Sequence, residues 1–213
     1  MCVTKQLKEL IKNELWDEQL SFSSIDKKDF SALQNIANMQ TVNGLVYSSL
    51  ISNNVKLPQQ EALVAFGSLE NTKKSNLLLN KNLIFLTGLL EKHNIKFFVV
   101  KGQTIAISYP HPLHRVGGDI DFFCFTQDFE RLIGILHKEL NVQPECEESE
   151  QHYSFLLNGT LFELHFTLYK FANTENQQYF DELINTDLLN HTVIGDKRIP
   201  TLSPTLNLIY TFL

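Results

Sequence analysis

Residues 117–125 of this chain read GGDIDFFCF, where two glycines precede an alternation of acidic and apolar residues. Side chains alternate between the two faces of a β-strand, so Asp119 and Asp121 point to the same side. Ile120 and Phe122 then point to the opposite side, which their apolar character predicts to be a core. Two neighbouring carboxylates repel each other, and a sheet has little reason to place them together without a cation. The stretch therefore predicts a strand that presents two metal-binding acids.

A hairpin further along the chain supplies a third acid. Two apolar runs, 153–157 and 161–168, flank an Asn-Gly pair, which is the strongest short-range signal for a hairpin. Glu163 and His165 share one face of the second run. If this run neighbours the strand with the two aspartates, we expect Glu163 to face them as a metal ligand or as a general base, with His165 in support. The alternative is a solvated carboxylate on an exposed hairpin face.

The metal and phosphate chemistry follows from the residue types. Magnesium prefers oxygen ligands and is bound through one or two carboxylates plus substrate phosphates, so we expect Mg²⁺ or Mn²⁺. A β-rich run at 95–100 ends at Lys101-Gly102, where a strand-to-helix turn offers free backbone N–H groups to a phosphate. Lys101 is a candidate point charge for phosphate, and Arg115 is a candidate for a bidentate clamp.

The rest of the chain divides by its periodicity. Residues 1–80 have apolar residues at helical spacing and predict a helical N-terminal region. Strands and helices mix over 81–200, which predicts an α+β core. The stretch 201–213 opens a further helix inside which the sequence stops, so a truncated longer protein is one interpretation. The acidic stretch 145–150 is typical of a solvated linker.

Composition narrows the class of protein. The chain has 213 residues, a net charge of −6 and three cysteines without paired spacing. The acidity argues against nucleic acid as a main partner, because phosphate backbones are bound by basic patches. No signal peptide or membrane-spanning stretch is evident, which predicts a soluble cytoplasmic protein. His111 and His114 suggest zinc, but no cysteine or third histidine lies at ligand spacing, so the sequence favours a flexible loop there.

Four short motifs of the chain resemble a known family. They are Val100-Lys101-Gly102, Tyr109-Pro110 with Arg115, Gly118-Asp119-Ile120-Asp121, and Glu163-Leu164-His165. Together they look like the uncharacterised bacterial nucleotidyltransferase family, a distant relative of the DNA-polymerase-beta-like superfamily. The resemblance covers about residues 95–168 and implies a polymerase-beta-like nucleotidyltransferase core, a small mixed sheet flanked by helices.

The resemblance also implies roles for individual residues. In the superfamily a glycine turn holds the triphosphate, and an Asp-x-Asp pair with a later acid holds the metal. By that resemblance Asp119, Asp121 and Glu163 are the catalytic metal ligands. The nucleotide-binding positions are Lys101, Gly102, Gln103, Arg115 and Gly118, although Gln103 stands where the superfamily usually has Ser or Gly.

These observations favour one function over two others. The first is a nucleotidyltransferase that moves a nucleoside monophosphate from a nucleoside triphosphate, preferably ATP, to a hydroxyl group of a small molecule or a protein. The second is a non-catalytic nucleotide-binding or interaction protein on the same fold, which the Gln103 departure motivates. The third is a metal-dependent phosphohydrolase. The sequence names neither the acceptor nor the oligomeric state.

Overall fold

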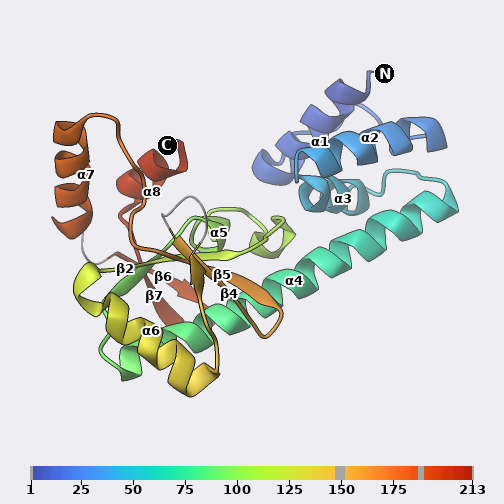
Figure 1. Cartoon of the computed structure of the whole chain (residues 1–213). Coiled ribbons are helices and arrows are strands. Elements are labelled where there is room, and N and C mark those ends of the chain that lie inside the picture. The colour runs from blue at the N-terminus through green and yellow to red at the C-terminus, as the bar shows by residue number, and fades with distance from the viewer. Residues whose placement is uncertain (1, 147–151, 187–189, 213) are drawn as a thin grey trace. The chain divides into compact units, whose positions relative to one another are not determined.

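The computed structural model of the chain describes residues 2–146, 152–186 and 190–212 (Figure 1). Apart from its first two residues, the predicted acidic linker at 145–150 lies outside the described residues. The chain divides into two compact units. The first comprises Met1–Leu77 with Ala106–Gly117, and the second comprises Leu78–Ile105 with Gly118–Leu213. The boundaries that the sequence suggested, at residues 80 and 200, stay a prediction.

The first unit is helical. It contains α1 (Val3–Trp16), α2 (Lys27–Met39), α3 (Asn43–Ser52), the beginning of the long helix α4 (Gln59–Lys92) and the short 3-10 helix η1 (Pro112–His114). Asp26 caps α2, because its side chain accepts a hydrogen bond from the backbone N–H of Asp29 at 2.8 Å. The helices enclose an apolar core built around Leu10, Leu33, Val46, Tyr47 and Leu50.

The second unit is built on a mixed sheet of seven strands in the order β3-β4-β5-β2-β1-β7-β6. The strands are β1 (Phe97–Val100), β2 (Ile120–Cys124), β3 (Glu145–Cys146), β4 (His152–Leu157), β5 (Thr160–His165), β6 (Asn190–Ile194) and β7 (Lys197–Thr201). The pairs β2–β5 and β1–β7 are parallel, and the other pairs are antiparallel. The predicted hairpin is confirmed, since Asn158 and Gly159 both have positive φ angles between β4 and β5.

Helices cover both faces of this sheet (Figure 1). The end of α4 and α6 (Thr126–Leu140) pack on one face, where apolar side chains of β1, β2 and β5 form the larger core. On the other face, α7 (Thr174–Thr186) and α8 (Pro204–Phe212) contribute Phe180, Ile184, Leu206 and Tyr210 to a second core. The short helix α5 (Gly102–Ala106) follows β1. The predicted α+β fold with a helical N-terminal region is therefore confirmed.

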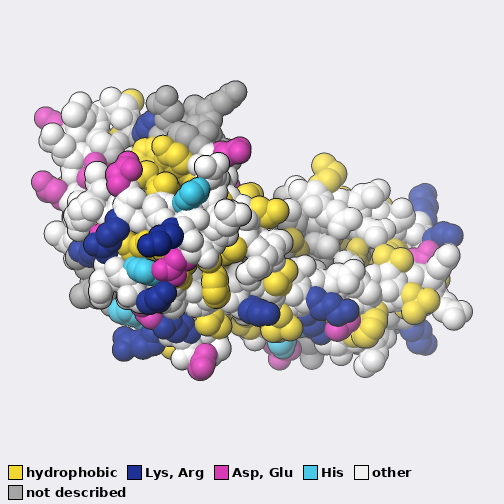
Figure 2. Space-filling view, turned by 60° about the horizontal axis from the view of Figure 1, so that its bottom comes forward, with side chains coloured by type: hydrophobic (Ala, Val, Ile, Leu, Met, Phe, Trp, Pro, Cys, Tyr) yellow, Lys and Arg dark blue, Asp and Glu magenta, His cyan; other side chains and the backbone are white. Residues whose placement is uncertain are grey.

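No helix among residues 2–146, 152–186 and 190–212 combines the length and the apolar character needed to cross a bilayer. On the face seen in Figure 2, acidic and basic side chains are interspersed. The described side chains on that face thus form no extended basic surface of the kind that binds nucleic acid backbones.

Cys124 on β2 gives a first testable result. Its thiol is fully buried, and burial together with the nearby charge of Asp128 raises its pKa to about 12. Since the thiolate is the reactive form, we expect native protein at neutral pH to leave Cys124 unmodified by iodoacetamide, while the exposed Cys2 is alkylated. Peptide-resolved mass spectrometry before and after unfolding measures this. Rapid native labelling of Cys124 would contradict the burial of β2.

Candidate active site

Two of the predicted acids, Asp121 and Glu163, lie on the neighbouring parallel strands β2 and β5. Asp121 lies directly opposite Glu163 in the register of the two strands. The residues on either side of them, Phe122, Phe162 and Leu164, are buried in the larger core. Strand alternation therefore turns both carboxylates to the other face of the sheet, where the side chains are 12% exposed for Asp121 and 20% for Glu163.

The charge of Asp119 also acts on Glu163, as the pKa of Glu163 indicates. The pKa of Glu163 is raised, first by burial and then by the negative charge of Asp121, with a further contribution from Asp119. His152 and His165 oppose the rise. Both aspartates are therefore near enough to act on the Glu163 carboxyl, and a common metal site for the three acids stays a prediction. A bound cation would relieve their repulsion, and the donor set of partly buried carboxylate oxygens fits Mg²⁺ or Mn²⁺.

Two histidines border the acids. His165 Nε2 lies 3.0 Å from Asp121 Oδ1 and 3.6 Å from Glu163 Oε2. An ionised carboxylate only accepts hydrogen bonds, so beside an ionised Asp121 this contact takes the tautomer of His165 in which the Nε2–H group is the donor. His152 on β4 approaches the same oxygen of Glu163, with 3.9 Å between Nε2 and Oε2, and its ring centre lies 5.0 Å from that of His165. His165 thus holds Asp121 more closely than Glu163, the residue that the sequence suggested it orients.

The turn after β1 reaches the same place. Val100 is paired with Asp121, so Lys101 and Gly102 follow directly beside the acids. Both residues have positive φ angles, +52° and +41°, a conformation that glycine adopts without strain and lysine does not. A Cβ on Gly102 would lie 3.6 Å from the carbonyl oxygen of Asp119, an ordinary contact, so the backbone angle is what favours glycine there.

Tyr210 on α8 joins this turn to the acids. The Lys101 Nζ atom lies 4.2 Å from the centre of the Tyr210 ring. The ring is buried, and the pKa of its hydroxyl is raised first by burial and then by the charges of Asp121 and Glu163. A lysine over this ring is held close to the negative site without a direct ion pair. Phosphate binding by Lys101 stays a prediction.

The other predicted phosphate contacts are placed differently. Gln103 is buried, and its amide donates to Asn80 Oδ1 on α4 at 2.5 Å, so its side chain is engaged inside the protein. Gly118 is exposed and begins the second segment of the second unit, and a Cβ there would meet no neighbour within 4 Å. Arg115 belongs to the first unit, where its carbonyl accepts a 2.6 Å hydrogen bond from Asn76. Nucleotide binding by these residues stays a prediction.

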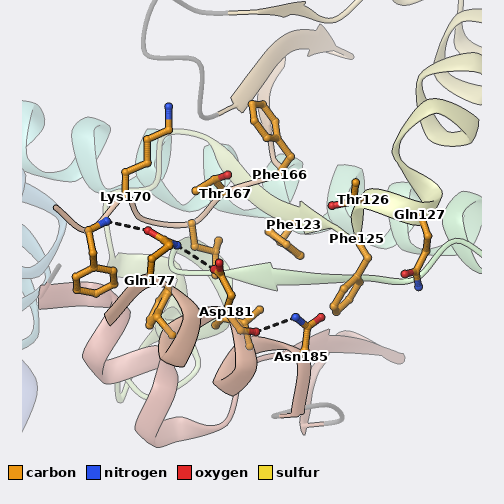
Figure 3. A pocket seen from close by; sticks show the side chains of 14 residues that line it. Phe123, Phe125, Thr126, Gln127, Phe166, Thr167, Lys170, Gln177, Asp181 and Asn185 are labelled. Carbon is orange, nitrogen blue, oxygen red and sulfur yellow. Dashed lines mark hydrogen bonds between the residues drawn. The ribbon is translucent and has the colours of Figure 1, made fainter. Parts of the chain in front are cut away.

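A cavity of about 590 Å³ opens on the acid-bearing side of the sheet (Figure 3). Its lining includes Phe123 and Phe125, which continue the face of β2 beyond Asp121. The opposite wall comes from α7, where Gln177 donates to Asp181 Oδ1 at 3.0 Å and accepts from the backbone N–H of Phe171 at 2.8 Å. The cavity thus combines aromatic rings with a few fixed polar groups, which is typical of a small-molecule site.

Sequence reasoning missed three contributors to this region: His152, Tyr210 and the helix α7. The two-residue turn of the hairpin sets a register that pairs His152 with His165, so counting back from the Asn-Gly pair would have found it. The buried residues of α7 are Phe180 and Ile184. Two apolar residues four positions apart in a polar stretch give only a weak helical signal. No local pattern places Tyr210 beside the acids, because that contact depends on how α8 packs.

Comparison with known proteins gives one family match. A family model described as an uncharacterised nucleotidyltransferase matches residues 26–213. No curated protein shows significant similarity to the sequence. Among solved structures, the crystal structure of an antigenic nucleotidyltransferase-like protein from Paracoccidioides brasiliensis is 17% identical, with a TM-score of 0.42 over 59% of this chain and 61% of that one. The match therefore spans about three fifths of that protein's length.

Proposed function

Because this chain belongs to the uncharacterised nucleotidyltransferase family, we propose that it transfers a nucleoside monophosphate from a nucleoside triphosphate to a hydroxyl group of a small molecule or a protein. ATP is the proposed donor, Mg²⁺ or Mn²⁺ the proposed metal, and the cytoplasm the proposed location. The observation that carries the proposal is the register that sets Asp121 opposite Glu163, beside the turn at Lys101.

The acids are the proposed ligands of the metal. The oxygen donors are the carboxylates of Asp119, Asp121 and Glu163. A divalent ion bound by them would neutralise negative charge on the reacting phosphate. His165 holds the Asp121 carboxylate through its 3.0 Å hydrogen bond, which fixes the orientation of that ligand. His165 therefore acts as a positioning residue in this proposal.

The transfer itself is a substitution at the α-phosphorus. The acceptor oxygen forms a bond to this phosphorus, the bond from it to the bridging oxygen of the β-phosphate breaks, and pyrophosphate leaves. The acceptor's hydroxyl proton passes to a base. Glu163 is the alternative candidate for that base where it does not ligate the metal, because a bound cation would lower the pKa that burial and the neighbouring carboxylates raise.

The remaining groups hold the substrates in this proposal. Lys101 and the turn at Gly102 lie beside the acids and are the proposed contacts of the triphosphate, with Gln103 and Gly118 contributing backbone groups and Arg115 a guanidinium. The cavity between β2 and α7 is the proposed site for the non-phosphate part of a substrate. Its aromatic walls suit a ring or an apolar group, and its Gln177–Asp181 pair can fix an orientation.

Labelled nucleotides test the function. The full chain is incubated with Mg²⁺ or Mn²⁺, an acceptor mixture of bacterial metabolites and proteins, and ATP labelled at either the α- or the γ-phosphate. We expect label from α-labelled ATP to enter an acceptor with release of pyrophosphate, and EDTA to stop it. Label from γ-labelled ATP should leave with the pyrophosphate. Nucleotide binding without product would favour a non-catalytic binding protein, and hydrolysis without a labelled acceptor would favour a phosphohydrolase.

A further inference from the structure

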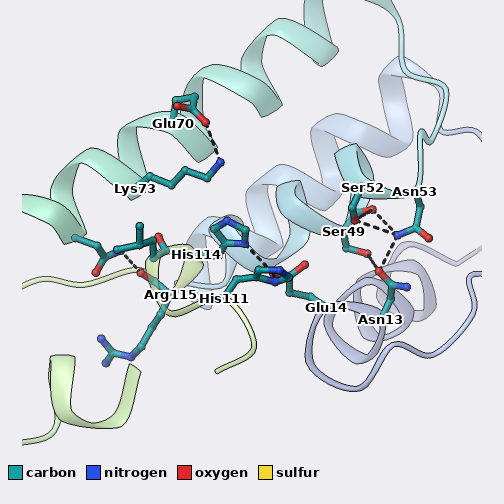
Figure 4. A network of polar contacts seen from close by, with 12 residues as sticks. Asn13, Glu14, Ser49, Ser52, Asn53, Glu70, Lys73, His111, His114 and Arg115 are labelled. Atoms are coloured by element: carbon teal, nitrogen blue, oxygen red, sulfur yellow. Dashed lines mark hydrogen bonds and ion pairs between the residues drawn. The ribbon is translucent and has the colours of Figure 1, made fainter. Parts of the chain in front are cut away.

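A second group of potential metal ligands lies in the helical unit. Glu14 on α1 meets His111 and His114 from the Pro110–Arg115 loop (Figure 4). The Nδ1 atoms of His111 and His114 lie 3.0 and 2.8 Å from the same oxygen, Oε1 of Glu14. All three ligand atoms lie within 4.8 Å of one another. Sequence patterns did not predict this group, because Glu14 is 97 residues from His111 and 100 residues from His114 along the chain.

The buried carboxylate and the two imidazoles of this group form a donor set that could hold a cation. The Glu14 side chain is only 4% exposed, so an ionised carboxylate there needs a strong counter-charge. The two imidazole rings are stacked with their centres 4.8 Å apart, so protonating both would set two positive charges face to face. A single divalent ion between the three donor atoms neutralises the carboxylate and leaves both imidazoles neutral.

The geometry is close to that of a zinc site. Zn²⁺ takes imidazole nitrogen at about 2.0–2.1 Å and carboxylate oxygen at about 2.0–2.2 Å, so tetrahedral ligands lie roughly 3.3 Å apart. The observed separations of 2.8 and 3.0 Å need only a few tenths of an ångström of side-chain movement. Two histidines and a glutamate are a ligand set that catalytic zinc sites use, with a fourth position left open.

The backbone around the ligands is fixed on both sides. Asn76, which is fully buried, donates to the carbonyl oxygens of Leu113 at 3.0 Å and Arg115 at 2.6 Å, and so clamps the residues that flank His114. A Cβ on Gly44 would come within 2.1 Å of the carbonyl oxygen of His114, so only glycine lets α3 approach the loop this closely. Ligands on fixed backbone are already arranged for binding.

The α1 side is held in the same way. Asn13, the neighbour of Glu14, accepts hydrogen bonds from Ser49 Oγ at 2.6 Å and from Asn53 Nδ2 at 2.8 Å (Figure 4). A cavity of about 370 Å³, lined by Glu14, His111, Asn13 and Asn53 among others, opens beside the ligands. His111 is 59% exposed. An ion at this place would therefore keep one side accessible to water or to an incoming ligand.

We propose that Glu14, His111 and His114 form a binding site for a divalent transition metal of the Zn²⁺ class, with an open coordination position toward the neighbouring cavity. The ion ties the loop at residues 110–115 to α1. This site is independent of the proposed nucleotidyl transfer, because its ligands are nitrogen-rich and belong to the helical unit. Imidazole ligands favour Zn²⁺ over Mg²⁺. His152, Glu163 and His165 of the second unit form another group of this composition, from which the test separates the proposed site.

The test is a titration of the full chain with Zn²⁺, and with Co²⁺ as a coloured substitute, in excess Mg²⁺. Calorimetry of H152N, which breaks up the similar group of His152, Glu163 and His165, should still give one Zn²⁺ site per chain, and Co²⁺ should give the visible absorption of a four-coordinate ion. We expect E14Q and H111N each to weaken Zn²⁺ binding at least about 100-fold, since loss even of an outer-shell partner costs 10–100-fold. E14Q alters a buried side chain and could disturb the fold. H111N tests the same site without that risk, because the His111 ring is largely exposed.

Two further variants locate the ion. H137N removes an exposed histidine of α6 and should leave the Zn²⁺ affinity unchanged. D121N changes the acid site and should also retain the Zn²⁺ site. Absence of stoichiometric binding by the unaltered chain, retention of it in E14Q or H111N, or its loss in D121N would each overturn the proposal.

Discussion

Replacing Asp121 with Asn is expected to lower nucleotidyl transfer at least about 10³-fold while the protein stays folded. The substitution keeps the shape of the side chain and an oxygen that can accept from His165, so the 3.0 Å contact survives. It removes the negative charge that a divalent ion needs. A 10³-fold loss corresponds to about 4 kcal/mol of transition-state stabilisation, within the several kcal/mol that a catalytic metal supplies.

The measurement for this variant is the transfer of α-label from ATP, together with Mn²⁺ binding followed by electron paramagnetic resonance. Both should fall, while circular dichroism and the unfolding midpoint change little. Asp196→Asn is the matched control, because Asp196 is an exposed acid between β6 and β7 and should retain full transfer. Transfer by the Asp121 variant at the unaltered rate would rule out the proposed role of this carboxylate.

Replacing Phe162 with Ala is expected to lower the free energy of unfolding by about 3–5 kcal/mol. Phe162 is fully buried, stacks on Phe155 with ring centres 5.2 Å apart, and meets the edge of Phe122 at 6.4 Å. Removing the ring leaves a cavity between rigid strands that cannot collapse to fill it. Because Phe162 pairs with Ile120, the same cavity loosens the register that aligns the acids.

Urea unfolding of the Phe162 variant measures this loss. Leu161→Ala is the matched control, since Leu161 precedes Phe162 in β5 but is 40% exposed and points to the other face. That change should cost only about 0.5 kcal/mol. Equal losses for the two variants would mean that β5 does not bury the face assigned to it.

Local patterns predicted the parts of the fold that depend on local chemistry. The alternation after the two glycines predicted β2, and the Asn-Gly pair predicted the β4–β5 hairpin. Such signals work because strand faces and turn angles are each fixed by a few adjacent residues. They also suggested that Glu163 and the aspartates share a face, without fixing which strands are neighbours.

The parts that the sequence did not predict depend on tertiary packing. The helix α7 and the hairpin of β6 and β7 are short and polar, with few buried residues to mark a period. The cavity wall that α7 supplies was therefore not foreseen. The parallel pairing of β2 with β5 joins strands on either side of α6, and the approach of Glu14 to His111 spans 97 residues. Periodicity within a segment carries no information about such contacts.

The central claim is that Asp119, Asp121 and Glu163 surround one divalent-ion site. A crystal structure of the chain with Mn²⁺ and a non-hydrolysable ATP analogue tests it most directly, because anomalous scattering locates manganese without ambiguity. We predict an anomalous peak within about 2.0–2.4 Å of oxygens from these carboxylates and from the nucleotide phosphates. A nucleotide bound with manganese elsewhere, or carboxylates that point away from the ion, would contradict the account.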